Sequence, residues 1–153
     1  MIVRQQLTAL EQHNRQASIF SLVGENSGAK NSTVNEVIFE AGGHMPPHSH
    51  SVEETLVFLS GEGILFIGQE PHSVCAGTTL VIPANTPHCF YNTGIGRARF
   101  ISFSPTSDLK FNWLPGLFPE SHPLPDEVPD ASSQDVDDPV IQEEVPELDP
   151  IAA

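Results

Sequence analysis

The sequence predicts an all-β fold, an antiparallel sandwich or jelly roll, from three observations. Short segments rich in β-branched and aromatic residues recur between residues 17 and 104. Glycine, proline or asparagine bounds each of them, at a spacing of about 8–12 residues. One other pattern precedes this series, a possible short helix at residues 7–15.

Eight segments are expected to form the strands of this fold. They are "ASIFSLV" (17–23), "TVNEVIFE" (33–40), "TLVFLSG" (55–61), "GILFIG" (63–68), "HSVCAG" (72–77), "TTLVIP" (78–83), "HCFYN" (88–92) and "RARFISFS" (97–104). The turns "SGEG", "GQEP" and "NTGIG" predict hairpins rather than helical crossovers. We therefore expect one barrel over residues 17–110, preceded by an N-terminal segment at 1–16.

The negative charge of the chain is concentrated at its C-terminal end. Residues 1–110 carry nine acidic and six basic side chains, whereas residues 111–153 carry eleven acidic and no basic ones, together with eight of the 14 prolines. From Glu120 onward there is no aromatic residue, so little apolar surface is available to offset the entropy of ordering. We expect residues 120–153 to be an acidic, disordered tail. The apolar segment 111–119, "FNWLPGLFP", is expected to pack on the barrel, or to cap its mouth or the partner subunit.

The composition argues against several classes of function. Nucleic acids and anionic membranes attract clustered lysine and arginine, and this chain has a formal net charge of −14. No apolar run approaches the ~18–20 residues that span a bilayer, and the N-terminus lacks the apolar stretch of a signal peptide. We expect a cytoplasmic protein in which Cys75 and Cys89 are free thiols and small buried side chains.

A cluster of potential metal ligands lies in "GGHMPPHSHSVEE", residues 42–54. His48 and His50 are two residues apart in a strand-like stretch, so their rings share one face. On a straight strand Glu54 would lie roughly 13 Å beyond His50, so the chain must turn or bulge at 51–53 if both bind one ion. His88 supplies a fourth ligand if its strand lies beside the first. Three imidazoles and one carboxylate suit Fe, Mn, Ni, Co, Cu or Zn, whereas Ca and Mg prefer oxygen ligands alone.

These residues resemble the first motif of the cupin superfamily. That motif reads G, five residues, H-x-H, three or four residues, E, six residues, G. The corresponding residues are Gly42, His48, His50, Glu54 and Gly61, and every spacing is met.

A second stretch resembles the second motif of the same superfamily, which reads G, five residues, P-x-G, two residues, H, three residues, N. The corresponding residues are Gly77, Pro83, Asn85, His88 and Asn92. The one departure is Asn85, where the family usually has glycine. Asparagine tolerates the left-handed backbone that such a turn requires, so the departure weakens the match little.

The resemblance implies a small double-stranded β-helix, which is a jelly-roll barrel. It also implies that His48, His50, Glu54 and His88 bind one divalent transition metal ion per chain, with Fe or Mn favoured. The barrel interior is then expected to take apolar residues, which are Phe39, Leu56, Phe58, Leu65, Phe90 and Phe100.

Other polar residues near the motifs have alternative roles. Glu53 competes with Glu54 for the carboxylate position, although it breaks the spacing to Gly61; its other role is a solvated turn residue. His44 either lines the mouth of the pocket, as a proton shuttle or a substrate contact, or is a polar loop residue. His72 lies in a turn and is expected at the surface.

Cupins include dioxygenases, decarboxylases, isomerases, lyases and non-catalytic binders, so the fold does not name the reaction. We expect a metal-dependent enzyme acting on a small organic molecule, with a dioxygenase-like oxidoreductase ahead of a lyase or isomerase. The alternative is a non-catalytic binding or sensor module, because only Tyr91, Arg97 and Arg99 offer a further acid or base near the motifs. We also expect a homodimer formed through edge strands. The tail either keeps the protein soluble or docks a protein partner.

Overall fold

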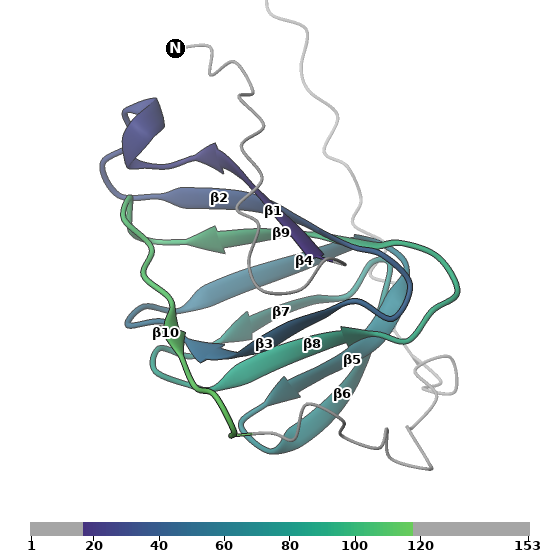
Figure 1. The fold of residues 1–153 in the computed structure, drawn as a ribbon. Helices are drawn as coiled ribbons and strands as arrows, with labels where there is room; N and C mark the ends of the chain where they lie inside the picture. The colour runs from purple at the N-terminus through teal and green to yellow at the C-terminus, as the bar shows by residue number, and fades with distance from the viewer. Residues whose placement is uncertain (1–16, 118–153) are drawn as a thin grey trace, which may run out of the picture.

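The structure, a computed structural model, describes residues 17–117. Within that range the chain forms two five-stranded antiparallel sheets, sheet A and sheet B, which pack face to face (Figure 1). The strand order is β1-β2-β9-β4-β7 in sheet A and β10-β3-β8-β5-β6 in sheet B. The predicted all-β jelly roll is therefore confirmed.

Sheet A consists of β1 (Ala17–Val23), β2 (Thr33–Phe39), β9 (Ala98–Ser104), β4 (Glu54–Ser60) and β7 (Thr79–Ile82). Sheet B consists of β10 (Asn112–Trp113), β3 (His44–Ser49), β8 (His88–Asn92), β5 (Glu62–Ile67) and β6 (Glu70–Cys75). The described residues contain one helix, the 3₁₀ turn η1 (Glu25–Ser27), and none there is long and apolar enough to cross a membrane.

The core lies between the two sheets and follows from the two-residue period of the strands. In β9 every second residue from Ala98 to Ser104 is buried, which is the alternation expected of a strand with one face toward a core. Phenylalanine rings from both sheets meet there, with centroids 4.9 Å apart for Phe39 and Phe90. Each such ring contributes about 1.5–3 kcal/mol by burial. The six predicted interior residues are all at most 5% exposed, which confirms them as core.

The connections between strands correct one expectation. "GQEP" does form a hairpin, because β5 and β6 pair up to Ile67 and Glu70. "SGEG" and "NTGIG" do not, because β4 and β9 belong to sheet A while β5 and β8 belong to sheet B. At these two glycine turns the chain crosses from one sheet to the other, which is how a jelly roll encloses its core from both sides.

The strand boundaries agree closely with the expected ones. β1 and β8 match to the residue. The strand-like stretch that contains His48 is β3. The two-residue strand β10, inside the apolar segment 111–119, was not expected as a strand. The possible helix at 7–15 and the acidic tail at 120–153 lie outside the described residues.

The two cysteines are free thiols, as expected, but only one of them is buried. Cys89 packs with Ile64 and Phe66, and burial raises the pKa of its thiol to about 12. Cys75 is exposed, so the expectation of a buried side chain is wrong there. It is the last residue of β6, an edge strand with a neighbour on one side only.

Candidate metal centre

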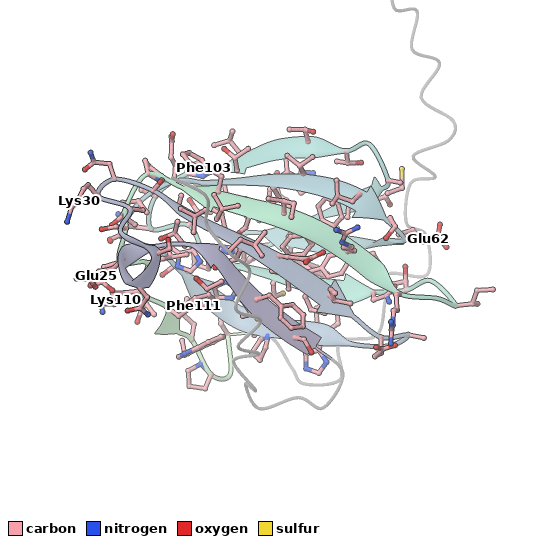
Figure 2. The ribbon with its side chains drawn as sticks, turned by 90° about the horizontal axis from the view of Figure 1, so that it is seen from above. Glu25, Lys30, Glu62, Phe103, Lys110 and Phe111 are labelled. Carbon is pink, nitrogen blue, oxygen red and sulfur yellow. The ribbon has the colours of Figure 1, made fainter. Side chains whose placement is uncertain are left out.

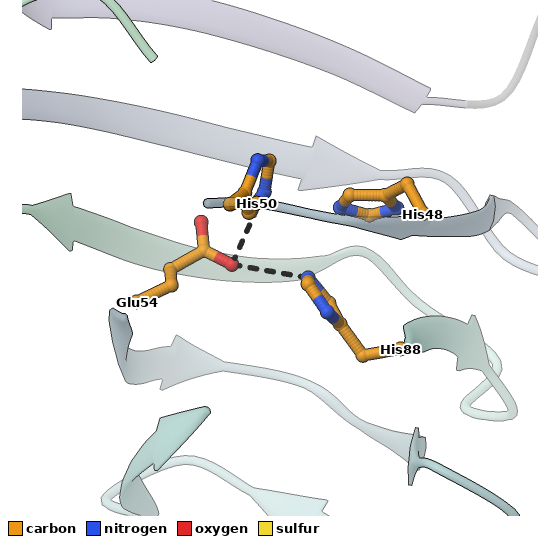
Figure 3. A group of neighbouring side chains, drawn as sticks. All are labelled: His48, His50, Glu54 and His88. Atoms are coloured by element: carbon orange, nitrogen blue, oxygen red, sulfur yellow. Dashed lines mark ion pairs between the residues drawn. The ribbon is translucent and has the colours of Figure 1, made fainter. Parts of the chain in front are cut away.

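The fold brings the four predicted ligand residues to one point. One ligand atom each from His48, His50, Glu54 and His88 lie within 4.8 Å of one another, and all four residues are buried (Figure 3). The Glu54 Oε2 atom is 3.2 Å from Nε2 of His88 and 3.7 Å from Nε2 of His50. This compactness is what a single ion bound at about 2.0–2.2 Å requires.

Both sheets contribute to the cluster. His48 and His88 are directly paired across β3 and β8 of sheet B, while Glu54 is the first residue of β4 in sheet A. The chain crosses between the sheets in the bend at 51–53, as the distance argument predicted. The β7–β8 turn holds this crossing, because the backbone N–H of Asn85 donates to the carbonyl of His50 at 2.6 Å. Asn85 has φ +60°, which confirms the left-handed backbone expected there.

Backbone carbonyls fix the orientation of all three imidazole rings. Nδ1 of His48 donates to the carbonyl of Pro46 at 2.7 Å, and Nδ1 of His88 to that of Thr86 at 2.9 Å. Nδ1 of His50 donates to the carbonyl of Lys110 at 2.7 Å. Because a carbonyl oxygen can only accept, Nδ1 carries the proton, and in the neutral ring Nε2 carries a free lone pair. Such a second hydrogen bond is typical of metal-binding histidines.

The inner nitrogen atoms have no hydrogen-bond partner. Nε2 of His50 and Nε2 of His88 are both fully buried and unpaired. The 3.2 Å contact between His88 and Glu54 does not satisfy them, because in the neutral tautomer it joins two acceptors. Unpaired buried acceptors are costly, and a cation among them would satisfy every lone pair at once. The donor set therefore fits a divalent transition metal ion.

Burial also sets the charge of the cluster in the metal-free protein. It lowers the pKa of His48 from 6.5 to about 3, with the neighbouring His88 charge adding to the effect. Burial likewise lowers the pKa of His50. Burial pushes the pKa of Glu54 upward, but contact with His88 and the charges of the three rings outweigh it, so this pKa is lowered. These shifts favour neutral rings at His48 and His50 and an ionised carboxylate at Glu54, the protonation states that bind metal.

Metal-free protein should lose stability as the pH falls from about 6.5 toward 3. The pKa of His48 is lower in the folded chain than in the unfolded chain. Its contribution to stability is therefore fully present above pH 6.5. Below that pH the unfolded chain binds a proton at His48 and the folded chain does not, so the contribution is lost. Each such proton adds a slope of about 1.4 kcal/mol per pH unit. Urea unfolding in the presence of a chelator, at pH 7, 6, 5 and 4, measures this slope. His48→Gln should flatten it, and stability rising on acidification would contradict the assignment.

A small cavity adjoins the ligands on the inner side of the barrel. Its volume is about 30 Å³, and its walls include His48, Glu54 and His88. The rest of its lining is Ile19, Asn35, Val37, Met45, Leu56, Leu65, Phe90, Phe100, Ser102 and Phe111. Four of the predicted interior residues therefore face this cavity, while Phe39 and Phe58 serve the core alone.

Two aromatic rings cover the outer side of the histidines. Phe111 lies 5.1 Å from the ring of His48 and 4.6 Å from that of His50. Trp113 lies 5.2 Å from the ring of His48 and stacks on Phe111. Their strand, β10, pairs with β3 at the two positions Asn112↔Ser49 and Trp113↔His48. Phe111 and Trp113 thus cover two of the clustered histidine rings, those of His48 and His50.

The other candidate residues lie away from the centre. Glu53 is exposed, as expected of a solvated turn residue, and His72 is at the surface. His44 is half-buried and stacks on Tyr91. Tyr91 packs with the Cys89 cluster, on the face of β8 opposite to Phe90.

The two arginines also point away from the cavity. Arg97 pairs with Glu40, and Arg99 pairs with Glu36. Among the described residues, His48, His50, Glu54 and His88 are thus the only ionisable groups at the cluster, because none of the other residues lining the cavity is ionisable.

Sequence reasoning missed three contributors to this site. Asn35 and Ser102 are the polar cavity residues outside the ligand set, and Lys110 offers its backbone carbonyl to His50. Asn35 and Ser102 left a weak signal, because they are polar side chains at buried positions of strands whose other buried residues include Val37, Phe39 and Phe100. Lys110 left no signal in the sequence, because every residue has a backbone carbonyl.

Comparison with known proteins gives one match to a family and one to a curated relative. The family described as "Cupin domain" matches residues 35–104. Auxin-binding protein T85 from Nicotiana tabacum is 38% identical over 66 residues. That match covers 37% of this chain and 35% of the relative, so the chain spans about a third of the relative's length.

Solved structures share the fold. The polyketide cyclase RemF from Streptomyces resistomycificus superposes with a TM-score of 0.64 at 22% identity, over 74% of this chain and 86% of that one. An oxalate oxidase in complex with the substrate analogue glycolate superposes with a TM-score of 0.60 at 25% identity. That superposition covers 65% of this chain and 56% of the oxidase.

Proposed function

This chain contains a cupin domain over residues 35–104, and from that premise we propose that it is a metal-dependent enzyme acting on a small organic molecule inside its barrel. The observation that carries the proposal is the pair of buried, unpaired Nε2 atoms of His50 and His88 beside Glu54. A divalent transition metal bound there supplies Lewis acidity, or electron transfer if it is Fe or Mn.

The chain's own residues account for the other parts of such a site. His48, His50, Glu54 and His88 hold the ion, and the carbonyls behind the three rings keep each Nε2 directed inward. The apolar lining excludes bulk water, which strengthens electrostatic interactions within the cavity. An oxidoreductase of the dioxygenase type is the favoured reaction class, ahead of a lyase or isomerase. The likeness to an oxalate oxidase supports this order.

A second candidate is a module that binds a small ligand at its metal without turnover. It is favoured by the cavity lining, where the described residues offer no ionisable group beyond the ligands to act as a separate acid or base. The similarity to an auxin-binding protein supports it as well. An enzyme would consume its ligand, whereas a binding module would be stabilised by the ligand and leave it unchanged.

Metal content tests the proposal directly. Plasma emission spectroscopy on untagged protein should find about one transition metal ion per chain in the wild type and almost none in His48→Ala/His88→Ala. The matched control is His44→Ala/His72→Ala, which removes two histidines outside the cluster and should keep the metal. Fe or Mn would favour oxidoreductase chemistry, to be followed by oxygen uptake with small acids and phenols. Ni or Zn would favour a non-redox or binding role. Absence of metal even after reconstitution would contradict both candidates.

A further inference from the structure

The cavity at the metal centre shares a wall with a second, larger space. This outer groove has a volume of about 160 Å³ and opens at the surface beside η1. Its lining includes Glu25 and Asp108. Three residues line both spaces, and these are Ile19, Asn35 and Phe111. They form the partition between the surface and the ligands.

Phe111 is the part of the partition that can move without breaking a sheet. Ile19 and Asn35 belong to β1 and β2, where each is paired with a neighbouring strand, and both are buried. Phe111 lies outside the strands, is half-buried, and precedes the two-residue strand β10. A rotation of its side chain would join the two spaces, whereas moving Ile19 or Asn35 requires a strand to shift.

We propose that ligands reach the metal centre through the outer groove and that Phe111 sets the size of the molecule that can pass. The inference refines the proposed function, because it concerns access to the same cluster. With Phe111 in place, the inner cavity of about 30 Å³ has room for one or two water-sized groups. Larger ligands need the space that Phe111 occupies.

The charges along this route indicate the class of ligand. The charged side chains that line the groove, Glu25 and Asp108, are both carboxylates, and Lys110 pairs with Asp108 at 2.7 Å. Figure 2 shows Glu25, Lys110 and Phe111 at one end of the molecule and Glu62 at the other. Among the described residues no lysine or arginine lines either space. Because Lys110 offsets the charge of Asp108, Glu25 remains as the uncompensated negative charge at the groove. The route therefore disfavours anions, and the mostly apolar inner cavity suits an uncharged molecule with an apolar body.

Trp113 provides a matched control for Phe111. It is also an aromatic residue of the segment 111–117, and its ring lies as close to His48 as the ring of Phe111 does. Unlike Phe111, it lines neither the cavity nor the groove. Loss of general packing should therefore appear in both alanine variants, and opening of the route in Phe111→Ala alone.

Histidine modification in metal-free protein tests the route without any metal. The readout is labelling of His88 by diethyl pyrocarbonate. Phe111 and Trp113 contact the rings of His48 and His50, and neither has a ring contact with His88 among the described residues. Their removal therefore does not uncover His88 directly. Phe111→Ala should raise the labelling rate of His88 at least about tenfold relative to the exposed His72, and Phe111→Leu by a smaller factor. Trp113→Ala should leave the rate within about twofold. Equal rates in wild type and Phe111→Ala, or an equal rise in both alanine variants, would overturn the proposal.

Ligand binding to Co(II)-loaded protein tests the size limit. Imidazole and benzimidazole are uncharged nitrogen donors at pH 8 that differ by one fused ring, and the visible bands of Co(II) report their binding. Phe111→Ala should improve benzimidazole affinity at least about tenfold and imidazole affinity less than about threefold, because only the larger ligand needs the vacated space. Benzimidazole-5-carboxylate should bind at least about tenfold more weakly than benzimidazole.

Failure of the access route can be distinguished from failure of the proposed function. Equal gains for both ligands, or the same gains in Trp113→Ala, would overturn the size limit. Tighter binding of the carboxylate would overturn the charge preference. Failure of the wild type to bind Co(II) would instead contradict the proposed function, while the His88 labelling would still decide whether the route exists.

Discussion

Glu54→Gln should weaken metal binding by at least about a hundredfold while leaving the metal-free fold intact. The substitution keeps the shape of the side chain and removes the one negative charge from the ligand set. Groups that merely orient metal ligands already contribute about 10- to 100-fold, and Glu54 is expected to be a ligand itself. A competition titration with a chromophoric chelator measures the change.

The stability of the metal-free protein should not fall on the same substitution. The amide that Glu54→Gln introduces can donate to Nε2 of His88, whereas the carboxylate of Glu54 faces it as a second acceptor at 3.2 Å. Relief of that contact should leave the free energy of unfolding unchanged or slightly higher.

Glu53→Gln is the control for this prediction. It makes the same chemical change at the adjacent, exposed residue and should alter neither metal affinity nor stability. A similar loss of affinity in both variants would mean that net charge near the bend, rather than ligation by Glu54, governs binding.

Gly61→Ala should destabilise the protein by more than about 3 kcal/mol, which is beyond the usual range for a single substitution. Gly61 has φ +78°, and an added Cβ would lie 2.5 Å from the Cα of Ala98 and 2.6 Å from the carbonyl oxygen of Arg97. Here β4 turns into β5 against the start of β9, so both neighbours are backbone atoms and neither can rotate away. Urea unfolding measures the loss.

Gly77→Ala separates the two causes of that loss, which are the left-handed backbone of Gly61 and its close approach to Ala98. Gly77 also has a left-handed backbone, with φ +92°, but an added Cβ would meet nothing within 4 Å. Its cost should be the conformational penalty alone, about 1–2 kcal/mol. Equal losses in the two variants would show that backbone conformation, and not the close approach to Ala98, makes Gly61 necessary.

The features that the sequence predicted well are those that depend on neighbours along the chain. Residue type and bounding turn residues identify β1 and β8 to the residue, because β-branched and aromatic side chains and the glycine, proline or asparagine beside them act locally. The distance between His50 and Glu54 required a bend at 51–53, because strand geometry limits how near two residues can come. The left-handed backbone of Asn85 followed from the side chains that tolerate it.

The features that only the tertiary structure decided involve partners far apart in the sequence. "GQEP" closes a hairpin, while "SGEG" and "NTGIG" carry the chain to the opposite sheet, although all three contain glycine. A glycine permits a tight turn in either case, and the burial of each strand's apolar face against the other sheet determines which one forms.

The same reason explains the parts of the metal centre that were not predicted. The carbonyl that orients His50 belongs to Lys110, sixty residues away. The segment 111–119 was expected to pack on the barrel or cap its mouth, but the sequence does not show that the ring of Phe111 lies between the cavity and the surface. The sequence by itself determined which side chains could bind a metal, through their chemistry and spacing. The packing of the chain around them decided how their rings are oriented and how the centre is reached, because long-range contacts leave no local pattern.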